Sequence, residues 1–263
     1  MGSCQTSYTN RLDDGRCGRS ALAKERDALM PIATLTALDG GSVKIDSPLS
    51  ITTVGATTFL VARIAGHLQE FGASDLPFAS HVASATQVVL DEEYSLQGGH
   101  LHLGSAEHSD GDGSEPRIFR LGVWSGNAYC VKTFIYGRPT RELIEIFSLF
   151  TIDERDDGVV LTPIRRGVSV AEKGAQVPKV VNNIPQLGLL EVRRLTPEIR
   201  NQFPPWEGAP GRGGQIYQDS PRGQGEGSLI LVGNTAVTRV YRDPALEDEE
   251  FVDAAAELLV TWS

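Results

Sequence analysis

Three histidines in one short stretch are the residues of this chain best suited to chemistry. The segment GGHLHLGSAEHSDGDGSE, residues 98–115, contains His100, His102 and His108 and then runs into an acidic loop. On a β-strand His100 and His102 would point to the same face, because successive side chains alternate. Two imidazoles on one face can bind a single zinc ion, with His108 or a loop aspartate as the third ligand and an open fourth position for water.

The same spacing also has a purely structural interpretation. Leu101 and Leu103 alternate with the histidines, so the leucines would fill a buried face while the imidazoles occupy the solvated one. The acidic loop does not match an EF-hand, which needs glycine at position six and glutamate at position twelve. Counted from Asp110, those positions hold Glu115 and Leu121. The sequence therefore predicts no cofactor, with zinc or another divalent metal on His100, His102 and His108 as the alternative.

Other catalytic motifs are missing from the sequence. It has no G-x-S-x-G pattern, no phosphate-binding Gly-Lys-Ser/Thr loop and no dinucleotide fingerprint. The glycines of residues 223–227 precede an expected strand, so no helix N-terminus follows to hold a phosphate. Cys130 lies among apolar neighbours, where burial would raise the pKa of its thiol and make it unreactive.

Charge and composition exclude several classes of function. The chain has 263 residues and a net charge of −10, and residues 243–263 contain seven acidic residues and no basic one. Its basic pairs, Arg165–Arg166 and Arg193–Arg194, are too few for the basic face of a nucleic-acid-binding protein. No apolar run is long enough to span a membrane, so we expect neither nucleic acid binding nor membrane insertion.

The N-terminal region and the cysteines indicate the compartment. The first thirty residues lack the apolar segment of a secretory signal and carry several acidic residues. The chain has only three cysteines, an odd number without a Cys-x-x-Cys pair, which does not suggest a disulfide framework. We therefore expect free thiols and a cytoplasmic location.

The pattern of apolar residues predicts an α+β fold with a mainly antiparallel β-sheet. Residues 32–136 are rich in alternating β-branched residues, and Ser125-Gly126-Asn127 predicts a hairpin between two apolar segments. An apolar stripe over residues 139–150 predicts one helix that covers a face of this sheet.

Four regions are expected along the chain. Residues 1–30 would form a flexible arm with a short helix, and residues 31–203 an α+β core domain. Residues 204–228, in which 11 of the 25 residues are glycine or proline, would form a loop or linker without regular structure. Residues 229–263 would form a hairpin and then an acidic helix from Asp243 to Trp262, packed on the core.

These expectations favour a non-catalytic binding or assembly protein. Trp206, beside Pro204 and Pro205, suits a docking element, since aromatic side chains contribute much of the binding energy of interfaces. The predicted partner is a protein, through self-association or a larger assembly. The alternative is a metal-dependent enzyme, a hydrolase that uses the His-x-His pair.

Overall fold

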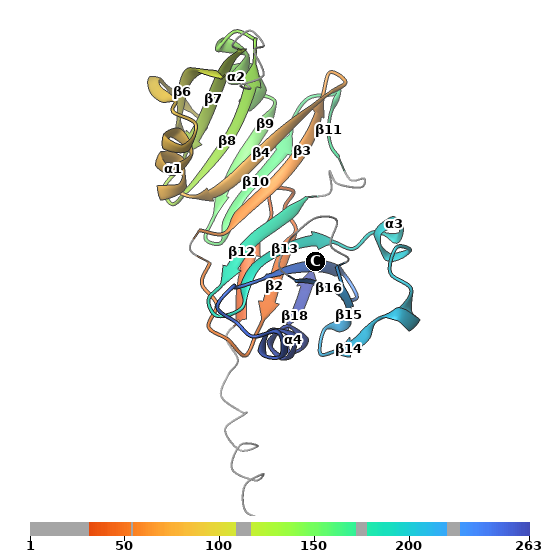
Figure 1. The fold of residues 1–263 in the computed structure, drawn as a ribbon. Helices are drawn as coiled ribbons and strands as arrows, with labels where there is room; N and C mark the ends of the chain where they lie inside the picture. The colour runs from red at the N-terminus through yellow and green to blue at the C-terminus, as the bar shows by residue number, and fades with distance from the viewer. Residues whose placement is uncertain (1–31, 54, 109–116, 172–177, 220–226) are drawn as a thin grey trace, which may run out of the picture. The chain divides into compact units, whose positions relative to one another are not determined.

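The computed structural model describes residues 32–53, 55–108, 117–171, 178–219 and 227–263 (Figure 1). The predicted arm over residues 1–30 lies outside this part of the chain, as does the acidic loop of residues 109–116. Within the described part, no helix is both long enough and apolar enough to cross a membrane.

The predicted mainly antiparallel β-sheet is confirmed, and its strands form two sheets. In the smaller sheet the order is β18 (Leu259–Trp262), β2 (Ser42–Asp46), β1 (Ile32–Thr36), β10 (Gly158–Pro163) and β9 (Phe150–Arg155). The larger sheet begins with β14 (Ala209–Gly211), β15 (Gly214–Gln218), β16 (Ser228–Val232), β17 (Ala236–Arg242), β13 (Gly188–Arg194) and β12 (Lys179–Ile184). It continues through β3 (Thr57–Ile64), β4 (His67–Asp75), β8 (Tyr129–Tyr136), β7 (Arg117–Ser125), β6 (Gly99–His108) and β5 (Val89–Leu96), with β11 (Val168–Val170) paired to β3.

Helices are few and short. The described residues form α1 (Pro77–Ala85), α2 (Arg141–Phe147), α3 (Pro197–Arg200) and α4 (Asp248–Ala256), with one 3₁₀ turn at Pro205–Glu207. The predicted helix over residues 139–150 is thus α2, although Phe150 already belongs to β9. Its residues Leu143 and Phe147 are buried against the sheet.

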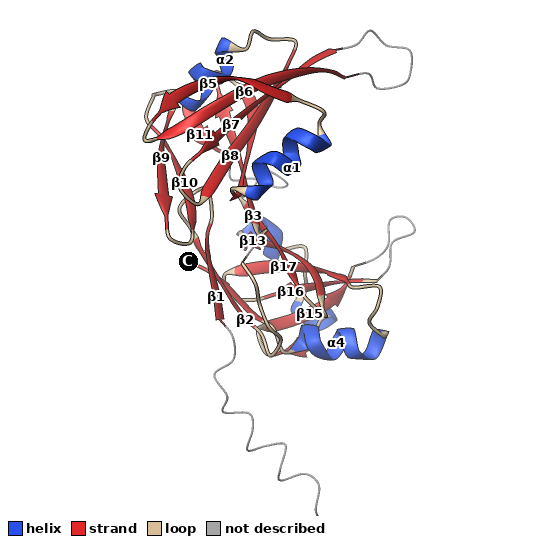
Figure 2. Cartoon of the chain, turned by 90° about the vertical axis from the view of Figure 1, so that its left-hand side faces the viewer, coloured by secondary structure: helices blue, strands red, loops and turns tan. Residues whose placement is uncertain are grey.

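The part of the larger sheet from β4 to β6 is covered by a helix on each face. Leu143 of α2 packs in one apolar cluster with Leu101 and Trp124, while Val82 of α1 packs in another with Val123. Figure 2 shows α1 lying along the strands beside β8. The sequence analysis expected one covering helix and missed α1, because its small residues offer a single apolar pair at helical spacing.

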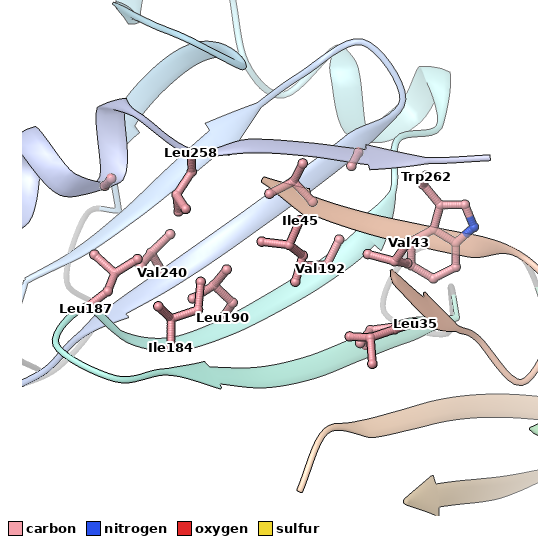
Figure 3. Close-up of a cluster of buried hydrophobic side chains, with 14 of the residues drawn as sticks. Leu35, Val43, Ile45, Ile184, Leu187, Leu190, Val192, Val240, Leu258 and Trp262 are labelled. Atoms are coloured by element: carbon pink, nitrogen blue, oxygen red, sulfur yellow. The ribbon is translucent and has the colours of Figure 1, made fainter. Parts of the chain in front are cut away.

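A third apolar cluster joins strands of both sheets (Figure 3). Val43 and Ile45 come from β2, Leu190 and Val192 from β13, and Val240 from β17, all of them fully buried. Helix α4 closes this cluster with Phe251 and Ala255. The C-terminal strands are therefore built into the same sheets as residues 32–194.

Two predicted segments differ from the structure. Residues 204–228 are not without regular structure, because β14 and β15 pair with each other and β15 pairs with β16. The acidic helix ends at Ala256, and residues 259–262 form β18 against β2. In both segments backbone pairing outweighs the local composition: β14 and β15 pair in a tight hairpin, and β18 pairs with the distant strand β2.

A polar contact fixes the turn between β1 and β2 on this cluster. The Arg194 guanidinium donates to Asp39 at 2.8 Å and lies 5.7 Å from the ring centre of Trp262. Asp39 in turn accepts the backbone N–H of Gly41 at 3.0 Å. Gly41 faces the Trp262 indole so closely that a β-carbon there would overlap the indole nitrogen.

We expect Gly41→Ala to lower the free energy of unfolding by about 1–3 kcal/mol, because the added methyl group forces the indole out of its buried position. Urea unfolding of the variant measures this loss. Gly227→Ala is the matched control, since a β-carbon there has no neighbour within 4 Å. Equal midpoints for the two variants would contradict the prediction.

Glu154 on β9 fastens the hairpin turn between β7 and β8. Its carboxylate accepts the backbone N–H groups of Asn127, Ala128 and Tyr129 at 2.8, 2.7 and 2.9 Å. Burial by itself would raise the pKa of Glu154, but these hydrogen bonds outweigh it and hold the pKa below its ordinary value.

A carboxyl group whose pKa is lower in the folded than in the unfolded state stabilises the fold above its unfolded pKa, about 4.3 for glutamate. That contribution is lost as the pH falls through the folded pKa. We therefore expect Glu154→Gln to be less stable than the wild type by about 1 kcal/mol at neutral pH. The difference should shrink below about pH 4. Thermal unfolding between acidic and neutral pH tests this, and a gap independent of pH would contradict it.

Candidate functional site

The histidine pair lies on the exposed face of β6. Leu101 and Leu103 are fully buried, while His100 and His102 point to the other face with ring centres 6.4 Å apart. His100 Nδ1 is 2.7 Å from a carboxylate oxygen of Glu93 on the neighbouring strand β5. Nδ1 of His100 is thus already in contact with a carboxylate.

The structure does not bring His108 to this pair. Strand β6 runs without interruption to His108, which pairs with Arg117 on β7. Six residues of extended chain separate the backbones of His102 and His108 by about 20 Å. Zinc ligands all lie about 2 Å from the ion, so the three histidines cannot share one. Among the described residues, no three His, Cys, Asp or Glu side chains are placed to hold a metal ion.

Cys130 lies in the apolar cluster beneath α1, with no exposed surface. Burial raises the pKa of its thiol to about 11, so the thiolate is scarce at neutral pH. The sequence prediction that burial raises this pKa is confirmed.

The surface around Trp206 is built from the segment between α3 and β14. The segment begins at α3, where Thr196 accepts the backbone N–H of Ile199 at 3.3 Å and Pro197 takes the first helical position. It then passes Phe203 and the 3₁₀ turn at Pro205–Glu207 before reaching β14 (Figure 1).

This segment is anchored to the sheet by Tyr217 of β15. The Tyr217 hydroxyl donates to the carbonyl oxygen of Pro204 at 3.0 Å, and its ring lies 5.2 Å from that of Phe203. Arg200 donates to the carbonyl oxygen of Asn234 at 3.0 Å, in the turn between β16 and β17. Trp206 projects from this anchored backbone with 82% of its surface exposed.

Two hollows meet at Phe203, and we call them together the docking surface. The first has a volume of about 250 Å³ and an apolar floor of Ile199, Phe203, Ile230 and Val237. The second has a volume of about 570 Å³ and is lined by Phe203, Pro204, Trp206 and Tyr217 together with the polar groups of Arg200, Asn201 and Asn234. Pro205 begins the 3₁₀ turn that carries Trp206.

Charged side chains of the sheet form one wall of the first hollow. Arg193 Nε donates to Glu191 at 2.7 Å, and Lys179 Nζ lies 3.3 Å from the same carboxylate. Burial alone would raise the pKa of Glu191, but the two neighbouring cations outweigh it and hold that pKa below its ordinary value. Arg239, opposite Glu191 in the register of β13 and β17, pairs with Asp219 at 2.9 Å.

Sequence reasoning found Trp206 and the two prolines but not the rest of the docking surface. Arg193 and Arg239 come from strands far apart in the sequence, and only the register of β13 with β17 makes them neighbours. Tyr217 was placed in a segment expected to lack structure. The useful signal was the β-favouring pair Ile216-Tyr217 between two glutamines, which marks a short strand within a glycine-rich stretch.

Comparison with known proteins gives no further guide: no protein-family model matches this chain, and no curated protein or solved structure is significantly similar to it.

The chain has three tryptophans, and the other two, Trp124 and Trp262, are only 2% and 3% exposed. We therefore expect acrylamide to quench one fraction of the intrinsic fluorescence readily, and Trp206→Phe to remove that fraction. Stern–Volmer plots of the wild type and the variant measure this. A readily quenched fraction that persists in Trp206→Phe would show that Trp206 is not the exposed tryptophan.

Proposed function

We propose that this protein is a non-catalytic binding protein and that the docking surface is where it engages a protein partner. The observation that carries the proposal is Trp206, the most exposed large apolar side chain among the described residues. Exposing an indole to water is unfavourable, and tryptophan is among the residues most enriched at binding hot spots.

The surroundings of Trp206 support this proposal. Its backbone is held by Tyr217 and the turn of residues 233–234, so little conformational freedom is lost on binding. The two hollows on either side of Phe203 offer concave apolar surface, and Arg193 and Arg239 provide polar groups at the rim. An apolar centre with a polar rim is the usual anatomy of a protein interface.

Selection of peptides from a random display library on the immobilised protein tests the proposal. We expect the selected peptides to bind Trp206→Ala at least about thirtyfold more weakly than the wild type, as loss of a hot spot of about 2 kcal/mol requires. Fluorescence anisotropy of the labelled peptides measures both affinities.

Ile164→Ala is the matched control, since Ile164 is an exposed apolar residue that does not line either hollow. Its peptide affinities should equal those of the wild type. Peptides that bind Trp206→Ala as tightly as the wild type, or a library that yields no binder, would overturn the proposal.

A further inference from the structure

Helix α4 presents an unusual outward face. Phe251 and Ala255 are buried, Glu249 and Asp253 lie on the opposite side of the helix, and Val252 lies on the flank between the two faces. These three positions fall on one stripe, because residues three and four apart are neighbours on a helix. Val252 is 43% exposed, so this stripe has an apolar side chain along one edge and two carboxylates beside it.

The first hollow of the docking surface has the complementary pattern. Its floor is apolar around Ile230 and Val237, and Arg193 and Arg239 stand beside that floor. A volume of about 250 Å³ accommodates a valine side chain with room to spare. Each guanidinium offers five N–H donors, so Arg193 can keep Glu191 and still bind a second carboxylate.

The spacing of the charges agrees as well. Arg193 pairs with Val237 across β13 and β17, so Arg239 is its diagonal neighbour, about 7–8 Å away. Glu249 and Asp253 are four residues apart on α4, which separates them by about 6 Å along the helix axis. A helix laid across the two arginines would therefore bring one carboxylate to each and direct Val252 at the floor.

The helix cannot reach the hollow of its own chain. Phe251 and Ala255 belong to the cluster that includes Ala236 and Val240, on one face of β17. Val237 and Arg239, which line the hollow, alternate with them and point to the other face. A β-sheet thus separates α4 from the hollow, and only a second molecule can supply the helix.

We propose that α4 of one copy binds in the first hollow of a second copy, so that the chain self-assembles head to tail. The proposal rests on the proposed function, since it names the partner of the docking surface. The two contacting patches are different, which makes the interface heterologous. In a pair formed this way, one copy keeps a free hollow and the other keeps a free helix, so assembly continues to a ring or a filament.

Sedimentation velocity over a range of protein concentrations tests this on the full chain. We expect the wild type to sediment faster as its concentration rises, and less so at about 1 M salt, where the Debye length is only about 3 Å. The helix variant Glu249→Lys/Asp253→Lys and the hollow variant Arg193→Glu/Arg239→Glu should each remain monomeric. Glu142→Lys/Glu145→Lys on α2 is the control, with the same change of net charge on another helix, and should assemble as the wild type does.

A mixture of the two defective variants gives the decisive result. One retains an intact hollow and the other an intact helix, so an equimolar mixture should associate although neither variant does so alone. Circular dichroism checks that each variant folds, and Val252→Asp with Arg239→Gln replaces any pair that does not. A wild type that stays monomeric, variants that assemble normally, or a mixture that does not associate would overturn the head-to-tail contact.

These outcomes are distinct from those of the peptide selection. Loss of peptide affinity in Trp206→Ala together with a strictly monomeric wild type would leave the docking surface in place and reject only α4 as its occupant. Concentration-dependent assembly with unchanged peptide affinity in Trp206→Ala would reject the Trp206 surface and retain the contact at the arginines.

Discussion

The alternation of side chains along β13, β16 and β17 is the constraint on which the rest of the structure depends. Val240 points into the shared apolar cluster, and Arg239, its neighbour in the chain, points out into the first hollow. A shift of one residue in the pairing of these strands would exchange the two faces. The core and the docking surface are therefore set by the same strand register.

The inner face is pinned by contacts that reach across the chain. Arg194 holds Asp39 of the β1–β2 turn and lies on the ring of Trp262. This arrangement ties β13, the N-terminal turn and the last strand into one unit. Arg193, which lines the first hollow, directly precedes Arg194 on β13. The contact between Arg194 and Asp39 therefore also helps to fix the position of the Arg193 guanidinium.

The outer face depends on a second set of anchors. The hydroxyl of Tyr217 and the guanidinium of Arg200 hold the irregular segment between α3 and β14 to the sheet. This segment contains prolines and a glycine, and it would have many conformations if it were free. Because this segment is held at both ends, the backbone of Trp206 has a defined position. Exposure of an anchored aromatic side chain is the feature that most sets this surface apart.

The segment with His100, His102 and His108 shows which features of a strand a local sequence pattern can predict. The alternation of Leu101 and Leu103 with the histidines predicted the buried face of β6, and the structure agrees. The distance of His108 from the histidine pair was not predictable. It depended on whether the strand ended at Gly104 or continued to pair with β7. Pairing of Gly104 with Leu121 keeps the strand extended, and this long-range contact leaves no trace in the composition of residues 98–108.

The sequence by itself determined the mainly antiparallel β character, the hairpin at residues 125–127 and helix α2. The hairpin and the helix follow from contacts between residues close in the chain, and the β character follows from the alternation of β-branched residues. The tertiary structure alone decided that residues 209–218 form strands, that the chain ends in β18, and that Arg193 and Arg239 flank one hollow. These features arise from backbone pairing between segments far apart in sequence. Such pairing satisfies hydrogen bonds and buries apolar surface wherever a partner strand is available, and so it overrides local preference.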